Sequence, residues 1–321
     1  MNFALSRKVL HMGGGRVLTP NTFNVRQLLN TFDTIVYAAD GVLWRHEEAL
    51  RGAADTFNAL RGMGKNAFIC TNNSSSSCRD LSKKANKLGF MVAENEILSS
   101  AQALARFMRE RKFQRKVYIV GGQGIKDELQ LVGIDSLPLD MASMQENSMA
   151  EQVQKMYFDA NVGAVAVGMD KDLNVVKLTK ASIYLRNSQT LFVATNRDRA
   201  FPVSADRHVP GAGVMVAAIE AVAKRPPFTC GKPSPYVCSH LMRQGVIQPA
   251  RTLMVGDTMY TDMQFGYNCG FHTLLVGTGV SSLKDVRTAQ ASKQPMVYQQ
   301  IPDLYLPRLS DLLPFLHSRN R

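Results

Sequence analysis

Four short segments of the chain carry side chains that could act together on a phosphate ester. They read Ala-Ala-Asp-Gly at 38–41, Thr-Asn-Asn at 71–73, Gly-Lys-Pro-Ser at 231–234 and Gly-Asp at 256–257, and Asp262 follows the last of them. Together they supply hydroxyl and amide donors, one ammonium group and three carboxylates. Mg²⁺ prefers oxygen ligands and takes one or two carboxylates plus phosphate oxygens, while lysine and backbone N–H groups neutralise charge on a reacting phosphate. The set indicates a Mg²⁺-assisted phosphoryl site.

Each segment also has an ordinary structural interpretation. Gly-Asp after a strand is often a turn, Thr-Asn-Asn often caps a helix, and Gly-Lys-Pro-Ser is often an exposed loop. Asp257 and Asp262 could likewise be capping groups. Singly, none of the four segments decides between the two interpretations. Their order and placement along the chain together favour the phosphoryl site.

The elements that would position these residues are short apolar runs alternating with helical stretches. Strands are predicted at 34–38, 66–71, 116–120, 163–167, 191–194, 252–255 and 273–276, and helices at 52–63, 79–88, 99–110, 213–224, 236–243 and 260–267. Such alternation predicts an α/β protein with a mostly parallel sheet. Ligands of these sheets bind at the carboxyl ends of the strands, which is where three of the four segments fall.

Length and charge set limits on the class of protein. At 321 residues the chain exceeds what one hydrophobic core usually organises, so we expect two domains or a core with a large insertion. The net charge of +12 would attract polyanions, membrane surfaces or small anions. Without an apolar run of membrane-spanning length or a nucleic-acid-binding module, we expect neither membrane nor nucleic acid as a partner. The densest basic cluster is interpreted as a solvated helix end; it comprises Arg106, Arg109, Arg111, Lys112, Arg115 and Lys116.

Cysteine usage and the N-terminus bear on location. The five cysteines are odd in number and none form a CxxC pair, which favours a reducing compartment and predicts a cytoplasmic protein. The first 32 residues contain no Asp or Glu. Residues 1–30 are therefore predicted to be a basic tail, and a mitochondrial transit peptide is the alternative.

The segment Gly-Gly-Gln-Gly at 121–124 follows a predicted strand and could be a nucleotide-binding loop. It lacks the GxGxxG spacing, so a tight strand-to-helix turn is the better interpretation.

The stretch 32–280 resembles the haloacid dehalogenase superfamily. More narrowly, it resembles the eukaryotic phosphoglycolate phosphatase, pyridoxal phosphatase and 4-nitrophenylphosphatase group. The matching segments are DGVLW at 40–44, TNNSS at 71–75, VGMD at 167–170, ATNRD at 194–198, PGAG at 210–213, GKPSPY at 231–236 and MVGDTMYTD at 254–262. The resemblance implies a Rossmann-like core with a parallel sheet at 31–100 and 207–321, an inserted α/β cap at 101–206, and a homodimer formed through the cap.

The resemblance also implies roles for individual residues, with a small phosphorylated metabolite as the ligand. Asp40 matches the general acid/base, and its backbone carbonyl would face Mg²⁺. Thr71, Asn72 and Lys232 match phosphate-binding residues, and Asp257 and Asp262 match the acidic pair that anchors Mg²⁺. In the cap, the loop 196–202 would reach over the substrate; the residues singled out there are Asn196, Asp198 and Phe201.

Position 38 departs from the family pattern. That pattern is Asp-x-Asp-Gly-Val, and here Ala38 stands where the nucleophilic aspartate belongs. If Asp40 were the nucleophile instead, Val42 would hold the acid/base position, and the carboxylate would move about 6 to 7 Å along the strand. Asp33 cannot substitute for the nucleophile, because it is five residues upstream, about 16 Å along an extended strand. The unusual Tyr37 and Ala39 beside it indicate natural divergence of the strand end rather than an engineered change.

Three interpretations of the missing nucleophile stay open. The chain could remain an active phosphatase that uses water activated by Asp40. It could be a pseudophosphatase that binds a phosphorylated ligand or a partner, or a stable fold whose site has drifted. We expect the ancestral reaction to be Mg²⁺-dependent hydrolysis of small phosphomonoesters such as phosphoglycolate or 4-nitrophenyl phosphate. Loss of the carboxylate at 38 predicts absent or very slow turnover and weaker Mg²⁺ binding.

Overall fold

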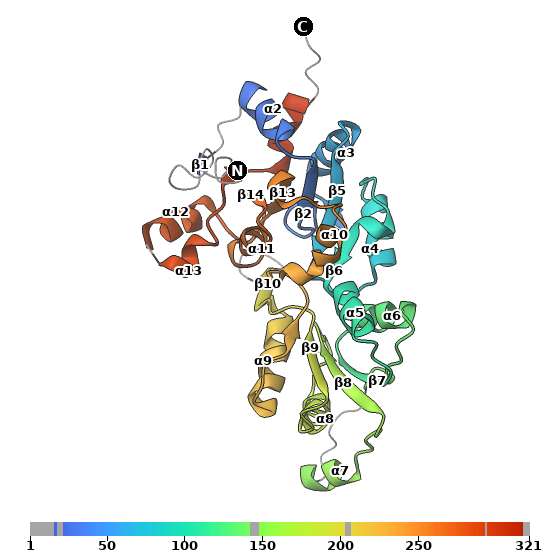
Figure 1. Cartoon of the computed structure of the whole chain (residues 1–321). Coiled ribbons are helices and arrows are strands. Elements are labelled where there is room, and N and C mark those ends of the chain that lie inside the picture. The colour runs from blue at the N-terminus through green and yellow to red at the C-terminus, as the bar shows by residue number, and fades with distance from the viewer. Residues whose placement is uncertain (1–15, 18–21, 142–147, 203–206, 293, 317–321) are drawn as a thin grey trace. The chain divides into compact units, whose positions relative to one another are not determined.

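A computed structural model describes residues 16–17, 22–141, 148–202, 207–292 and 294–316 (Figure 1). The chain divides into two compact units. The first comprises Met1–Thr71, Ser82–Ile97 and Cys238–Arg321, and the second comprises Asn72–Leu81 and Leu98–Val237. Much of the basic tail predicted for 1–30 lies outside the described residues. The described part is more ordered than expected, because it contains β1 (Arg16–Val17) and α2 (Thr22–Asn30), and α2 buries Val25 and Leu29.

The first unit is built on a parallel sheet, as the alternation of strands and helices predicted. Its strand order is β1-β15-β14-β13-β2-β5, followed by β6, where the chain passes into the second unit. The bounds are β15 (Leu304–Leu306), β14 (His272–Val276), β13 (Thr252–Gly256), β2 (Thr34–Tyr37), β5 (Asn66–Thr71) and β6 (Ile97–Ser99). Strands β2, β13 and β14 are buried along their whole length, which is why they read as continuous apolar runs.

The order in which strands are added to the sheet reverses at β2. From β2 the chain adds β5 on one side, and β13 later pairs on the other side. Such a switch point leaves a crevice at the carboxyl ends of the strands, where open α/β sheets bind ligands. Residues after β2 and β13 therefore meet at one edge of this sheet.

Helices and short turns complete the first unit and its connections. They are α3 (Ala53–Gly62), α4 (Cys78–Lys87), α10 (Ser239–Arg243), α11 (Gln264–Cys269), α12 (Leu283–Ser292), α13 (Pro295–Tyr298) and α14 (Leu313–Leu316), with 3-10 turns at Glu94–Glu96, Pro249–Arg251 and Leu309–Leu312 and a π-helical turn, η4, at Met259–Met263. Strands β3 (Trp44–Arg45) and β4 (Glu48–Ala49) form a short hairpin.

The second unit has its own parallel sheet, of order β12-β9-β8-β7. These strands are β12 (Phe228–Thr229), β9 (Leu191–Ala194), β8 (Val162–Val167) and β7 (Lys116–Val120). The helices are α5 (Ser100–Glu110), α6 (Gln123–Leu131), α7 (Met149–Lys155), α8 (Val175–Leu185) and α9 (Ala212–Ala223), with a 3-10 turn at Pro235–Val237. Strands β10 (Ala200–Pro202) and β11 (His208–Pro210) pair antiparallel.

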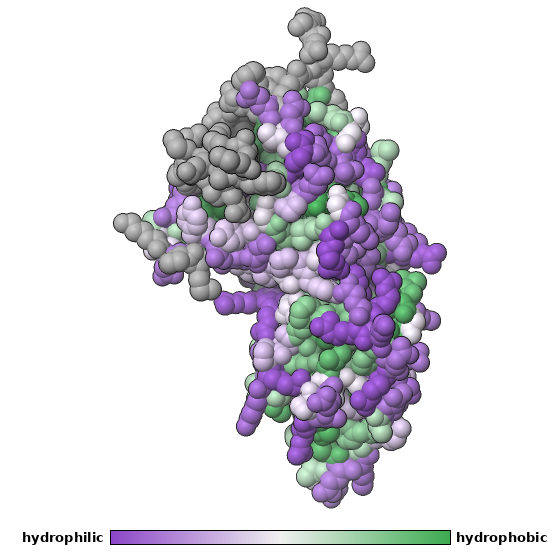
Figure 2. All heavy atoms as spheres, viewed as in Figure 1, coloured by the Kyte–Doolittle hydropathy of each residue, from purple (hydrophilic) through white to green (hydrophobic). Residues whose placement is uncertain are grey.

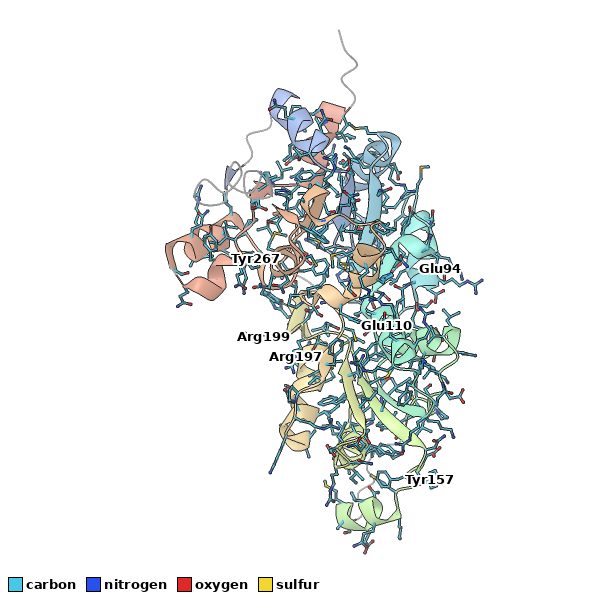
Figure 3. The ribbon with its side chains drawn as sticks, viewed as in Figure 1. Glu94, Glu110, Tyr157, Arg197, Arg199 and Tyr267 are labelled. Atoms are coloured by element: carbon cyan, nitrogen blue, oxygen red, sulfur yellow. The ribbon has the colours of Figure 1, made fainter. Side chains whose placement is uncertain are left out.

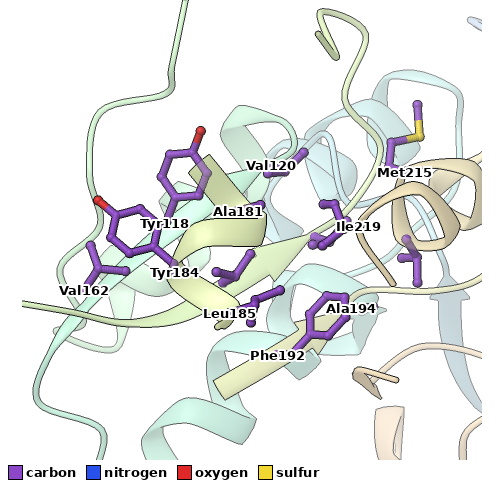
Figure 4. Close-up of a cluster of buried hydrophobic side chains, with 13 residues drawn as sticks. Tyr118, Val120, Val162, Ala181, Tyr184, Leu185, Phe192, Ala194, Met215 and Ile219 are labelled. Atoms are coloured by element: carbon purple, nitrogen blue, oxygen red, sulfur yellow. The ribbon is translucent and has the colours of Figure 1, made fainter. Parts of the chain in front are cut away.

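Helices α8 and α9 pack on this sheet around a buried apolar cluster (Figure 4). Tyr118 of β7 and Tyr184 of α8 have ring centroids 5.3 Å apart, and Ile219 of α9 is fully buried. The predicted core and cap boundaries, 101 and 206, remain a prediction. The compact units divide differently, because β12 pairs with β9 and thereby joins 207–237 to the second unit.

Hydrophilic side chains cover most of the visible surface, and hydrophobic residues are exposed in patches on the second unit (Figure 2). The basic cluster is mostly exposed, as expected of a solvated helix end: Arg109, Arg111, Lys112 and Arg115 are exposed, and Arg106 is the buried exception. Arg106 is buried and donates to the backbone carbonyls of 236–237, and Arg115 donates to that of Val162 at 2.8 Å. Arg111 lies 3.6 Å from the ring centroid of Phe107. Arg106, Arg111 and Arg115 thus make contacts within the second unit.

The segment Gly-Gly-Gln-Gly forms a strand-to-helix turn between β7 and α6, as predicted. The Gly124 N–H donates to the Ser75 carbonyl at 3.0 Å. A Cβ on Gly124 would lie 2.5 Å from the backbone of Ser76. These glycines allow one backbone to pass close to another, which accounts for them without a nucleotide.

Candidate active site

Ala38 is the first residue beyond β2. Its N–H donates to the carbonyl of Val255 at 2.8 Å, and the residue is 3% exposed. Asp40, two residues further on, is exposed. Asp33 lies before the strand and is held there by the guanidinium of Arg251, whose Nη2 lies 2.6 Å from Asp33 Oδ1. Asp33 and Asp40, the two carboxylates of this segment, thus lie on either side of residue 38.

Tyr37, directly before Ala38, is fully buried. Its ring centroid lies 5.0 Å from that of Phe57 on α3. The hydroxyl has no hydrogen-bond partner among the described residues, and burial raises its pKa far above the ordinary value. An unsatisfied buried hydroxyl is a cost to stability that a phenylalanine would avoid.

The turn after β2 brings backbone against a carboxylate. The Gly41 N–H donates to the Trp44 carbonyl at 2.9 Å, and Gly41 has a φ of 78°. A Cβ at Gly41 would lie 2.5 Å from Asp257 Oδ2. Glycine is needed here for both its left-handed conformation and its lack of a side chain. The Asp-Gly and Gly-Asp segments thus meet in space, as the sequence interpretation required.

Asp257 follows β13 and is enclosed by backbone. Its Oδ2 accepts the N–H of Val280 at 2.9 Å, and its carbonyl accepts that of Ser281 at 2.8 Å. Gly279 also abuts the carboxylate, so a side chain there would collide with it. The loop after β14 therefore holds Asp257 in a fixed position at the sheet edge.

Asp262 holds the loop that presents Asp257. It lies in the π-helical turn η4 and is 2% exposed. Its Oδ2 accepts the N–H groups of Asp257 at 3.0 Å and Thr258 at 3.2 Å. A buried carboxylate that accepts two backbone N–H groups is satisfied on that oxygen. Local π-helical turns recur at functional sites. Here the turn brings the Asp262 carboxylate to the backbone N–H of Asp257.

Thr278 is a site residue that sequence reasoning missed. Its Oγ1 donates to the Gly41 carbonyl at 2.5 Å, and its own carbonyl accepts Arg45 Nη2 at 2.7 Å. These bonds tie the loop after β14 to the turn that carries Asp40. The only signal in the sequence was a Gly-Thr-Gly directly after a predicted strand.

The donors of the first unit suit Mg²⁺ by their chemistry. No group of three or more His, Cys, Asp or Glu side chains able to hold a metal occurs among the described residues. Mg²⁺ does not require such a cage, because it usually keeps waters and takes one or two carboxylates plus phosphate oxygens. The carboxylate of Asp257, set against the backbone of Gly41, is an oxygen donor of this kind.

The second unit contributes a second group of predicted residues. Asn72 follows Thr71, the buried last residue of β5. The Asn72 Nδ2 donates to the Asp198 carboxylate, with distances of 3.2 Å to Oδ1 and 3.1 Å to Oδ2, and to the Lys232 carbonyl at 3.0 Å. Lys232 is 5% exposed. The structure therefore brings together three residues that the sequence had placed on separate segments.

The loop 196–202 is held by backbone contacts at its start. Asn196 is buried and accepts the Thr195 hydroxyl at 2.8 Å. Gly211 and Gly213 pass so close to this loop that a Cβ on either would collide with its carbonyls. Arg197, which is labelled in Figure 3, pairs with Glu220 of α9 at 2.9 Å. Phe201 lies on β10, and its side chain falls outside the description.

The predicted site residues thus fall into two groups. Those of the first unit are Ala38, Asp40, Thr71, Asp257 and Asp262, and those of the second are Asn72, Asn196, Asp198, Phe201 and Lys232. Within the first group, the turns at 40–41 and 256–262 are packed together. Within the second, Asn72 contacts both Asp198 and Lys232.

Comparison with known proteins finds related sequences over nearly the whole chain. A family model described as haloacid dehalogenase-like hydrolase matches residues 35–135, and a second HAD-hydrolase-like model matches 229–311. Glycerol-3-phosphate phosphatase of Gallus gallus is 38% identical over 309 residues, which are 95% of this chain and 99% of that protein. Phosphoglycolate phosphatase 2 of Arabidopsis thaliana is 36% identical over 304 residues, 92% of this chain and 97% of that protein.

Solved structures share the fold. The p-nitrophenyl phosphatase of Archaeoglobus fulgidus superposes with a TM-score of 0.72 at 25% identity, covering 88% of this chain and 98% of that one. A match over nearly the whole of that chain includes both units.

Proposed function

The chain belongs to the haloacid dehalogenase-like hydrolases, and from that premise we propose that it binds small phosphomonoesters with Mg²⁺ and hydrolyses them very slowly or not at all. Phosphoglycolate and 4-nitrophenyl phosphate represent the proposed ligand class. Ala38 carries the proposal. It directly follows strand β2, two residues before the proposed acid/base Asp40, and its side chain is a buried methyl group at the position that matches the family's nucleophilic carboxylate.

The chemical consequence follows from covalent catalysis. An attacking carboxylate would take the phosphoryl group, and Asp40 would protonate the leaving alcohol and then activate water. Methyl cannot attack phosphorus. Removing the nucleophile from a catalytic unit costs about a millionfold in a protease precedent, which corresponds to roughly 8 kcal/mol of transition-state stabilisation. Asp40 would still be able to protonate a leaving alcohol, but no residue would take the phosphoryl group covalently.

The binding groups are retained. Lys232 is proposed to hold the phosphate, with Thr71 at the end of β5. Asp257, Asp262 and the Asp40 carbonyl are proposed to hold Mg²⁺, which when bound would neutralise phosphate charge. The carboxylate missing at 38 is expected to weaken the metal site. It also lowers the repulsion of an incoming phosphate dianion, so binding should survive better than hydrolysis.

Two assays test this proposal. Steady-state turnover of 4-nitrophenyl phosphate with Mg²⁺ should be at background. Inorganic phosphate or phosphoglycolate at millimolar concentration should raise the melting temperature, and Lys232→Ala should abolish the shift. No shift in the unaltered protein would count against the binding function. Turnover at an ordinary enzymatic rate would count against the inactive site.

A homodimer formed through the cap is also proposed. Helix α9 exposes an apolar face at helical spacing, made of Val214, Ala217, Ala221 and Val222. Such a stripe usually needs a partner surface. Val214→Lys together with Val222→Lys should convert the dimer into a monomer in light scattering, because two charges would be buried at the interface. Both side chains face solvent in the single chain, so the protomer itself should still fold. A monomeric unaltered protein would contradict this.

The cytoplasm is the proposed location. The cysteines Cys70, Cys78, Cys230, Cys238 and Cys269 are all buried and none forms a disulfide, which is typical of a reducing compartment. Among the described residues, no helix has the length and apolar character to cross a membrane.

A further inference from the structure

Asn72 was assigned to phosphate binding by resemblance, but its side chain is already committed. A carboxamide has two N–H donors and one carbonyl acceptor. Three acceptor atoms lie within 3.2 Å of Nδ2: both oxygens of the Asp198 carboxylate and the Lys232 carbonyl. One N–H can serve the carboxylate and the other the carbonyl, which accounts for both donors.

The contacts determine the orientation of the amide. Asn72 Oδ1 is buried and has no partner among the described residues, and a Cβ at Gly231 would lie 2.5 Å from it. Turning the amide over would set this oxygen against a carboxylate and a carbonyl, which are both acceptors. The orphaned acceptor is the smaller cost. Only an asparagine in this orientation serves both partners.

The two partners belong to different segments. Asp198 lies in the loop 196–202, 126 residues from Asn72, and Lys232 lies 160 residues away. The same segments also touch each other, because the Gly231 N–H donates to the Thr195 carbonyl at 2.6 Å. The Asn72 backbone is itself anchored, since its carbonyl accepts the Ser100 hydroxyl at 2.9 Å.

We propose that Asn72 is a positioning residue that couples the Lys232 segment to the loop 196–202, so that an anion held at Lys232 orders that loop. The coupling within the free protein rests on the contacts above, and its response to an anion rests on the proposed function. Asn72 acts through its two partners and need not touch the ligand. A neutral amide is required, because a carboxylate at residue 72 would repel Asp198.

The test is hydrogen exchange followed by mass spectrometry, with and without inorganic phosphate. Asn72→Asp should speed exchange in both 196–202 and 231–234 of the free protein, by on the order of tenfold for loss of a hydrogen bond to a charged group. The double variant Asn72→Asp with Asp198→Asn exchanges donor and acceptor. It should restore slow exchange in 196–202 but not in 231–234, because the Lys232 carbonyl still lacks its donor.

A matched control separates positioning from general destabilisation. Asn174→Ala removes the asparagine that caps α8 in the same unit, where Oδ1 accepts the Lys177 N–H at 3.1 Å. It should leave exchange in 196–202 and 231–234 unchanged. Unchanged exchange of both segments in Asn72→Asp, or equal acceleration in Asn174→Ala, would overturn the coupling.

Phosphate separates this proposal from the function it builds on. In the unaltered protein, phosphate should slow exchange in 196–202, and Asn72→Asp should abolish that response. If phosphate binds but leaves 196–202 unaffected, the coupling to the anion is wrong while the binding function stands. If phosphate does not bind at all, the proposed function fails, and the exchange in the free protein still decides whether Asn72 couples the two segments.

Discussion

The backbone N–H of Ala38 lies 2.8 Å from the carbonyl oxygen of Val255 and donates to it. The bond extends a parallel ladder in which Tyr37 is paired with Val255 on one side and with Ile69 on the other. Bringing Asp40 to this position would require a shift of two residues in both pairings, about 6 to 7 Å along the strand. The sheet thus supports residue 38 as the place from which a family nucleophile would act.

Asp262 should matter to stability as well as to metal binding. Asp262→Ala leaves the buried N–H groups of Asp257 and Thr258 without their acceptor, so the free energy of unfolding should fall by about 2–4 kcal/mol. Urea denaturation measures this. Asp285→Ala is the control: it removes the exposed carboxylate that accepts the Ser282 N–H, and its effect should be much smaller. Equal effects would show that Asp262 is not a structural clamp.

The strands were readily predicted because fully buried parallel strands read as continuous apolar runs. The predictions for 66–71, 116–120 and 191–194 match β5, β7 and β9 at both ends. No residue range was predicted for helix α6 or helix α8. The first begins at a glycine-rich turn, and the second is rich in β-branched residues, whose restricted side chains make a helix hard to recognise locally.

The sequence suggested the residue types of the candidate site but not their contacts. Short motifs singled out Asp257 and Lys232, because a Mg²⁺-assisted phosphoryl site needs carboxylates for the metal and an ammonium group for the phosphate. The spacing of residues along the sequence gives no sign of the hydrogen bond from Asn72 to the Lys232 carbonyl, 160 residues away. Nor does it reveal Thr278, whose bond to Gly41 joins segments 237 residues apart.

Replacing Tyr37 by phenylalanine should stabilise the protein. Its hydroxyl is buried without a partner among the described residues, so Tyr37→Phe should raise the free energy of unfolding by about 1 kcal/mol. Tyr118→Phe is the matched control. The Tyr118 hydroxyl donates to Asp140 at 3.2 Å, so its removal should destabilise. A destabilising Tyr37→Phe would mean that the hydroxyl has a partner after all.

The buried ion pair of the second unit should be sensitive to the loss of either member. Lys177 Nζ lies 2.8 Å from Asp170 Oδ2, and the side chains are 4% and 3% exposed. Lys177→Met should therefore destabilise by about 3–5 kcal/mol, because it leaves a buried charge unpaired. Adding Asp170→Asn should recover much of the loss. Lys84→Met, at the exposed pair with Glu47, should have little effect. Denaturant titration distinguishes these outcomes.

Acid should weaken the first unit through Asp33. The hydrogen bond from Arg251 lowers the pKa of Asp33 below its ordinary value. A carboxyl with a lowered folded pKa stabilises the fold above its unfolded pKa, near 4, and that contribution is lost as pH falls through the folded pKa. Between about pH 4 and pH 2, Asp33→Asn should therefore lose less stability than the unaltered protein. Asp172→Asn, at an exposed aspartate, is the control. If stability falls with pH in the same way for Asp33→Asn and for the unaltered protein, Arg251 does not have this role.

The most direct test of the proposed inactivity is turnover of 4-nitrophenyl phosphate with Mg²⁺, measured side by side for the unaltered protein and Ala38→Asp. The unaltered protein should show background rates only. Ala38→Asp should gain several orders of magnitude, and adding Asp40→Asn should remove that gain. An unaltered protein that turns over at about 1 s⁻¹ or faster, and loses this activity in Asp40→Asn alone, would contradict the account.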